Sequence, residues 1–169
     1  MSLAELGMVP GKVETIERTA TYVNDPLAAF AQLCGEKPHA LLLESAEIDS
    51  KDNLQSLLMV DGALRFECRG QEVAIQALSA NGKGLLPLFM ENCPADLKCQ
   101  IVSETEITLQ CHSQTANLDE DSRLKSTSVF DVLRMVVKQI TPLRDHQHAV
   151  FLGGVFAYDL LATFEDLPE

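Results

Sequence analysis

The sequence has few basic residues. Only 13 of its 169 residues are lysine or arginine, against 25 aspartates and glutamates, and the formal net charge is −12. A chain with this charge balance repels phosphate backbones and anionic lipid surfaces. We therefore expect neither nucleic acid nor a membrane to be its main partner.

Long apolar runs are also missing. No stretch approaches the roughly 18 residues that a membrane-spanning helix needs, and the start, Met1-Ser2-Leu3, shows no basic region followed by an apolar one, so no secretory signal is expected. Hydrophobic residues make up 46% and charged residues 22%, as in soluble globular proteins. No repeat or linker divides the chain, so we expect a cytoplasmic protein and a single domain over residues 1–169.

Familiar catalytic and metal-binding motifs are absent too. The sequence has no P-loop, no Gly-x-Gly-x-x-Gly, no nucleophile elbow and no Cys-x-x-Cys, and its five cysteines are expected to be reduced thiols. Adjacent acids in Asp119-Glu120-Asp121 cannot all face one ion, and His146 and His148 lack a third ligand at matching spacing. We expect no catalytic residue and no metal site in this chain.

Turn residues and periodicity predict antiparallel strands with a few helices. The sequence predicts a helix after an Asp25 cap and Pro26, a short helix over residues 85–91, and a helix that begins with a capping box of Ser128 and Asp131. Asp61-Gly62 between two apolar runs predicts a hairpin. The predicted strands cover residues 13–23, 40–43, 56–60, 63–66 and 73–78, with a turn at 69–71 and a flexible loop at 79–84. Residues 99–111 are predicted to form either one strand or a hairpin.

These elements indicate an α+β fold, an antiparallel β meander or sandwich with a few packed helices, because helices and strands do not alternate strictly. The best helix should bury an apolar face, and the run at 40–43 should be a strand buried on both faces. The predicted helix face consists of Val129, Val132, Leu133, Val136, Val137 and Ile140.

One strand end carries polar groups. Leu43 is followed by Glu44 and Ser45, which suits a ligand with an apolar body and an ammonium group, since a carboxylate and backbone carbonyls accept its hydrogen bonds. The simpler interpretation is that Glu44 is solvated and Ser45 caps the next turn. The residues alone leave both interpretations open.

Several segments, in order along the chain, resemble the amino-terminal part of the anthranilate synthase component I family. The run at 41–45 is similar to that family's L-L-E-S element. Further similar segments span 50–58, 119–124, 128–131, 153–159 and 164–168.

The resemblance implies that the parent protein converts chorismate to anthranilate, with magnesium and with ammonia from a glutamine amidotransferase partner. It also implies that Leu43, Glu44 and Ser45, and possibly Gln55, bind the feedback inhibitor L-tryptophan. The catalytic region would lie beyond this chain, which we expect to be inactive alone and to self-associate through the apolar residues between Gly153 and Phe164.

Two other functions remain open. One is the large subunit of aminodeoxychorismate synthase, although that group commonly has histidine or aspartate where this chain has Glu44. The other is a free-standing, non-catalytic domain that binds an amino acid or a protein.

Overall fold

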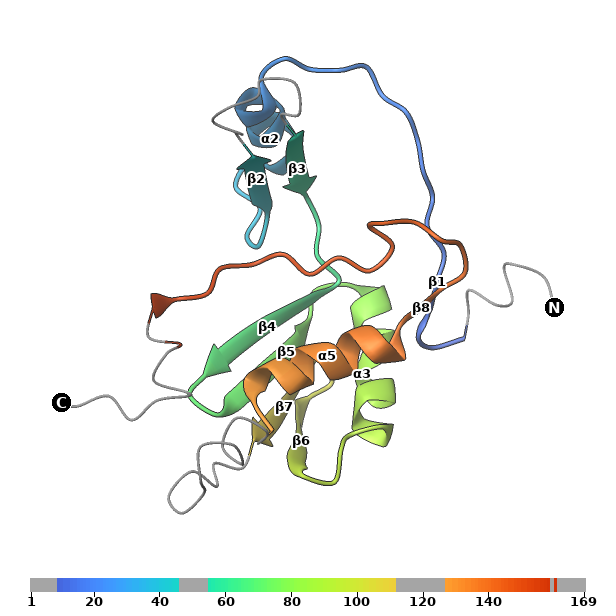
Figure 1. Cartoon of the computed structure of the whole chain (residues 1–169), viewed down its shortest axis with the longest axis vertical. Helices are drawn as coiled ribbons and strands as arrows, with labels where there is room; N and C mark the ends of the chain where they lie inside the picture. The colour runs from blue at the N-terminus through green and yellow to red at the C-terminus, as the bar shows by residue number, and fades with distance from the viewer. Residues whose placement is uncertain (1–8, 46–54, 112–126, 159, 161–169) are drawn as a thin grey trace. The chain divides into compact units, whose positions relative to one another are not determined.

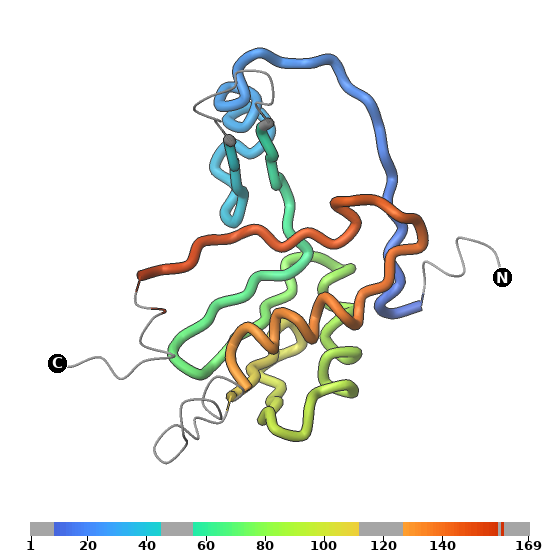
Figure 2. Tube along the Cα trace, viewed as in Figure 1, coloured from blue at the N-terminus to red at the C-terminus, as the bar shows by residue number. Residues whose placement is uncertain are grey.

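The computed structural model describes residues 9–45, 55–111, 127–158 and 160, which group into two compact units. The larger unit contains residues 9–15, 63–111, 127–151, 156–158 and 160, and the smaller unit contains 16–45, 55–62 and 152–155. Figure 1 labels their helices and strands, and Figure 2 traces the chain through both. The single domain expected over residues 1–169 stays a prediction.

The larger unit is built on a four-stranded antiparallel sheet. Strands β4 and β5 join through a turn in which Gly70 has a φ of 57°, a conformation that glycine adopts without steric cost. Strands β6 and β7 form a second hairpin, which is one of the two alternatives predicted for residues 99–111. The sheet order is β4-β5-β7-β6, with β4 at Leu64–Arg69, β5 at Glu72–Ala77, β6 at Leu97–Ser103 and β7 at Glu106–Cys111.

Two helices, α3 (Ala80–Glu91) and α5 (Val129–Gln139), contribute to one core with the sheet. Because side chains alternate along a strand, one face of the sheet is apolar and packs against both helices. The fully buried side chains at this contact make the core of the larger unit, and removing any of them from water contributes about 1.5–3 kcal/mol. They include Val73, Ile75, Phe89, Leu109, Val132 and Val136.

Helix α3 begins earlier than the sequence indicated. Its N-cap is Ser79, whose Oγ accepts a hydrogen bond from the Gly82 amide at 3.1 Å. The helix also passes close to Ala63, since a Cβ at position 82 would lie 2.0 Å from the Ala63 carbonyl oxygen. The flexible loop predicted at 79–84 was therefore wrong: its serine is a cap and its first glycine permits a close contact.

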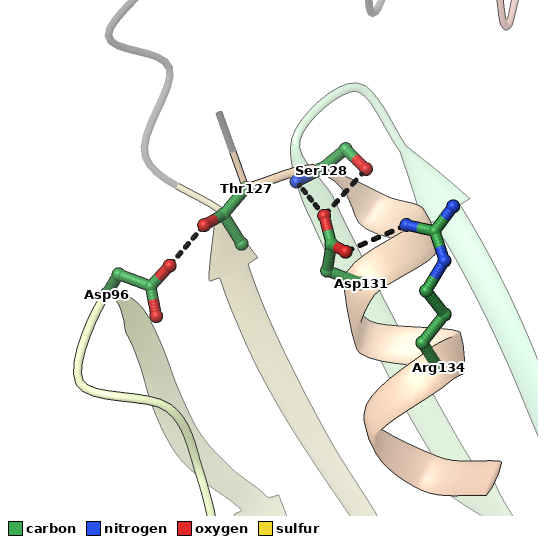
Figure 3. A network of polar contacts seen from close by, with 5 residues as sticks. All are labelled: Asp96, Thr127, Ser128, Asp131 and Arg134. Carbon is green, nitrogen blue, oxygen red and sulfur yellow. Dashed lines mark hydrogen bonds and ion pairs between the residues drawn. The ribbon is translucent and has the colours of Figure 1, made fainter. Parts of the chain in front are cut away.

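Helix α5 begins with the predicted capping box. The Ser128 amide donates a hydrogen bond to the Asp131 carboxylate at 2.8 Å, and the Ser128 hydroxyl donates another at 3.0 Å (Figure 3). The predicted buried face was wrong in part, because Val137 is 40% exposed and Met135 is buried. Residue 135 lies closer to the 129–132–136 stripe than residue 137 does.

The smaller unit contains one helix and one strand pair. Helix α2 (Pro26–Cys34) has the predicted cap, with Asp25 Oδ1 accepting from the Ala28 amide at 2.9 Å, and Gly35 follows its last residue. Strand β2 (Leu41–Ser45) pairs with β3 (Gln55–Met59). The hairpin predicted at Asp61-Gly62 was wrong, since β3 pairs with β2 whereas β4 pairs with β5.

The strand predicted at 13–23 was also wrong for most of its length. Only β1 (Lys12–Val13) forms, and it pairs in parallel with β8 (Thr141–Pro142). The α+β class with antiparallel sheets is confirmed. Among the described residues, no helix is long and apolar enough to cross a membrane.

The cysteines depart from the expectation of reduced thiols. Cys93 and Cys99 are joined by a disulfide, so the expectation was wrong for this pair. The turn after α3 brings the two residues together, an arrangement that motif spacing does not reveal. Of the others, Cys34 and Cys111 are buried and Cys68 is exposed.

Candidate ligand-binding site

The register of β2 and β3 determines which predicted site residues share a face. Leu43 lies opposite Leu57, Glu44 opposite Ser56, and Ser45 opposite Gln55. Because successive strand positions alternate between faces, positions 43, 45, 55 and 57 lie on one face of the pair. The pairing thus brings together three of the four predicted positions, from two segments that are separate in the sequence.

The apolar part of this face is open to solvent. Leu43 is 44% exposed, and its cross-strand neighbour Leu57 is half-buried. The strand predicted at 40–43 was therefore not buried on both faces: β2 belongs to a two-stranded sheet. Directly opposed residues in such a pair have Cβ atoms about 4.5–5.5 Å apart, so the two leucines form a continuous apolar surface.

Glu44 lies on the other face of the strand pair. It is opposite Ser56, and both residues are exposed. An exposed carboxylate beside a hydroxyl can accept hydrogen bonds from an ammonium group. The structure therefore separates Glu44 from the face that carries positions 43, 45 and 55.

Leu57 and Ser56 were missing from the set of residues inferred from the sequence. They face Leu43 and Glu44 only because β3 pairs with β2. The Asp61-Gly62 signal assigned β3 to a hairpin with the following strand, so the cross-strand partners of the 43–45 segment were not found. The apolar run at 57–60 was the available signal for a strand, but such a run does not specify a partner.

One ion pair joins the two chain segments that flank the β2–β3 strand pair. Lys37, in the connection after α2, donates from Nζ to Asp61 Oδ1 at 3.0 Å. Both side chains are largely exposed, and such a pair stabilises by about 0–1 kcal/mol. It links the segment before β2 to the segment after β3.

The other site-like features of the sequence have no metal-binding geometry in the described ranges. The rings of His146 and His148 lie 5.8 Å apart and edge-on, and the His148 amide donates to His146 Nδ1 at 3.1 Å. Within the described part of the chain, no three His, Cys, Asp or Glu side chains gather closely enough to hold a metal ion. Residues 119–121 lie outside the described ranges.

Comparison with curated proteins finds relatives over nearly the whole chain. It is 49% identical to anthranilate synthase component 1 of Serratia marcescens over 150 residues, which are 88% of this chain and 28% of that protein. It is 48% identical to the protein of that name from Vibrio cholerae, and 45% identical to the one from Escherichia coli, covering 93% of this chain and 30% of each relative. No family model matches the chain.

These comparisons confirm the resemblance inferred from the ordered sequence segments. The chain spans about 30% of the length of the curated relatives that it matches.

Proposed function

From the relationship of this chain to the amino-terminal region of anthranilate synthase component I, we propose that it serves as that region of a larger subunit in tryptophan biosynthesis. The observation that carries the proposal is the identity of 45–49% over about nine-tenths of the chain. The complete enzyme would convert chorismate to anthranilate with ammonia supplied by a glutamine amidotransferase partner.

The magnesium that the resemblance implies would be held by the region that this chain does not span. Among the residues that the structure describes, no three Asp, Glu, His or Cys side chains lie close enough together to hold a metal ion. Hard divalent cations need oxygen ligands that converge on one point, which isolated surface carboxylates do not provide. The role of this chain is then regulatory and structural.

We assign feedback binding of L-tryptophan to the face of the β2–β3 pair that carries positions 43, 45 and 55. The exposed Leu43, beside Leu57, offers an apolar wall for the indole ring. Positions 45 and 55, a serine and a glutamine opposite each other, would provide hydrogen bonds for the amino-acid end of the ligand. Glu44 would reach the ammonium group from the strand end, around the edge of the ribbon.

The test uses the longer polypeptide that contains this region, or a chimera in which the chain replaces the matching part of the Escherichia coli relative. Anthranilate formation is measured across a tryptophan titration for the parent and for the Ser45→Phe and Glu44→Lys variants. We expect each variant to weaken inhibition by roughly ten- to a hundred-fold, the effect of losing a hydrogen bond to a charged ligand group. Uninhibited activity should stay close to that of the parent.

A matched control is Glu36→Lys, an exposed acid in the same unit that follows helix α2 and lies on neither strand. It changes charge by the same amount as Glu44→Lys, so a shift for Glu44→Lys alone would identify a local effect. Superimposable inhibition curves for the parent, Ser45→Phe and Glu44→Lys would show that this strand end is only structural.

A further inference from the structure

The seven residues from Cys93 to Cys99 form a closed segment between a helix and a strand of the larger unit. Cys93 directly follows Asn92, the C-cap of α3, and Cys99 is the third residue of β6. The two Cα atoms lie 6.7 Å apart, within the range that a disulfide spans. The ends of the segment are therefore close because of the fold itself.

Backbone hydrogen bonds hold both cysteines independently of the sulfur atoms. The Cys93 amide donates to the Met90 carbonyl at 3.4 Å, and Cys99 is paired with Leu109 in the sheet. The Leu97 amide donates to the Pro94 carbonyl at 3.0 Å and closes the turn between the two cysteines. The Cys93 sulfur also lies 3.9 Å from the Leu97 carbonyl oxygen, where a thiol, but not a disulfide sulfur, can donate a weak hydrogen bond. The same backbone thus suits both the oxidised and the reduced pair.

The pair is also more accessible than the cysteines of the core. Cys93 and Cys99 are each half-buried, whereas Cys34 and Cys111 are 3% and 1% exposed. Burial raises the pKa of the Cys111 thiol to about 11, so little of it is the reactive thiolate near neutral pH. Cys68 is exposed, but it has no disulfide partner among the described residues.

The segment between the two cysteines is connected to helix α5. Asp96 accepts a hydrogen bond from the Thr127 hydroxyl, and Thr127 immediately precedes the Ser128 cap (Figure 3). The residues at the start of α5 are therefore hydrogen-bonded to two carboxylates: Thr127 to Asp96, and Ser128 to Asp131. The Asp96–Thr127 hydrogen bond thus connects the 93–99 turn to the residue before the helix cap.

We propose that Cys93 and Cys99 are a reversible exchange site for small thiols and disulfides, with glutathione as the probe, and that the disulfide orders the Asp96 contact at the start of α5. In oxidation, one protein thiolate attacks oxidised glutathione, forms a mixed disulfide and releases one reduced glutathione. The second protein thiolate then attacks the protein sulfur of that mixed disulfide and releases the second reduced glutathione. The protein loses two electrons and two protons, and oxidised glutathione gains them.

The first experiment equilibrates the chain with mixtures of reduced and oxidised glutathione, quenches with acid, alkylates the denatured protein and counts modified cysteines by mass. At the oxidising end we expect three modified cysteines and a peptide cross-linked between Cys93 and Cys99. At the reducing end we expect five. Five at every ratio, a cross-link between other cysteines, or a disulfide that excess reduced glutathione cannot open would each overturn the proposal.

Two variants provide matched controls. Cys68→Ser removes the exposed cysteine outside the pair and should leave the loss of two thiols unchanged. Cys99→Ser leaves Cys93 without the second thiol of the pair, so Cys93 should stop at the mixed disulfide and carry one glutathione. Absence of that adduct together with an intact pair in Cys68→Ser would contradict the two-step exchange.

The second experiment measures amide hydrogen exchange of residues 127–131 in the two redox states. We expect exchange there to be severalfold slower in the oxidised protein, and Asp96→Ala to abolish the difference by removing the acceptor for Thr127. A melting temperature about 5 °C higher for the oxidised chain is the accompanying expectation, because a disulfide restricts the unfolded state. Equal exchange in both redox states would overturn the link to α5.

Discussion

At the scale of single residues, Asp131 has a clearly defined structural role, because it caps the start of helix α5. Its carboxylate accepts hydrogen bonds from the Ser128 amide and hydroxyl and from Arg134 Nη1 at 2.8 Å. Partial burial by itself raises the pKa of Asp131, but the hydrogen bonds from Ser128 and Arg134 outweigh it and hold that pKa below its ordinary value. These bonds form with the ionised carboxylate, so its contribution to stability depends on pH.

We expect Asp131→Ala to lower the free energy of unfolding by about 1 kcal/mol at pH 7, the usual effect of losing a helix cap. Because the folded pKa is below the unfolded one, this contribution is complete above the unfolded value of about 3.9 and is lost as pH falls through the folded pKa. Urea unfolding of both proteins at pH 7 and pH 3 checks this expectation. A deficit of the same size at both pH values would contradict it.

Some predictions failed because one residue type is compatible with more than one local structure. Gly82 was taken as part of a flexible loop, yet its lack of a side chain lets α3 approach Ala63. A glycine permits both outcomes, and only the neighbouring backbone decides between them. The Asp25 and Ser128 caps were predictable, by contrast, because a cap is determined within four residues of sequence.

At the scale of elements, the presence of helices α2, α3 and α5 was predictable, whereas the partners of the strands were not. The β6–β7 hairpin and the turn at Gly70 follow from adjacent segments. Asp61-Gly62 has the same local signature as a hairpin turn, but β3 pairs with β2 from the other side. This error also concealed the candidate site, whose positions 43, 45 and 55 come together only through that pairing.

Helix α5 offers a test of which apolar positions carry stability. Val132 is fully buried, whereas Val137, on the same helix, is 40% exposed. We expect Val132→Ala to lower the free energy of unfolding by roughly 2 kcal/mol, since it removes buried methyl groups and leaves a cavity. Val137→Ala should change it by less than about 0.5 kcal/mol. Chemical unfolding of both variants measures the difference, and equal effects would mean that the helix is rotated from the orientation described.

At the scale of the whole molecule, we expect the isolated chain to form no anthranilate from chorismate with magnesium and either ammonia or glutamine. The chain spans about 30% of its relatives' length, and the resemblance implies that the catalytic groups belong to the rest of the parent protein. Anthranilate fluorescence of the purified protein, compared with a no-protein control, is the measurement. The Escherichia coli relative, assayed under the same conditions with ammonia, serves as the positive control. Signal above background from the chain alone would refute the expectation.

The extended segment 151–158 exposes several large apolar side chains, as do residues 16–33 and 101–102. In residues 151–158, Val155 is 88% exposed, Phe156 65% and Tyr158 91%. Leu160 packs against the core instead, and Leu161 and Phe164, which the sequence also indicated, lie outside the described residues. Consecutive exposed side chains of this kind are typical of surfaces that another part of a protein covers.

We therefore expect the isolated chain to self-associate, with its mean mass rising as concentration rises. Burying about 25 cal/mol per Å² of apolar surface favours contact between copies when the covering region is absent. Light scattering on a size-exclusion column across a wide concentration range measures the effect. A Val155→Ser, Phe156→Ser double variant should shift the population toward monomer, whereas Val137→Ser, a single exposed site on α5, should shift it little. A monodisperse monomer at every concentration would show that segment 151–158 does not drive association, and an unchanged distribution in the double variant would assign association to another surface.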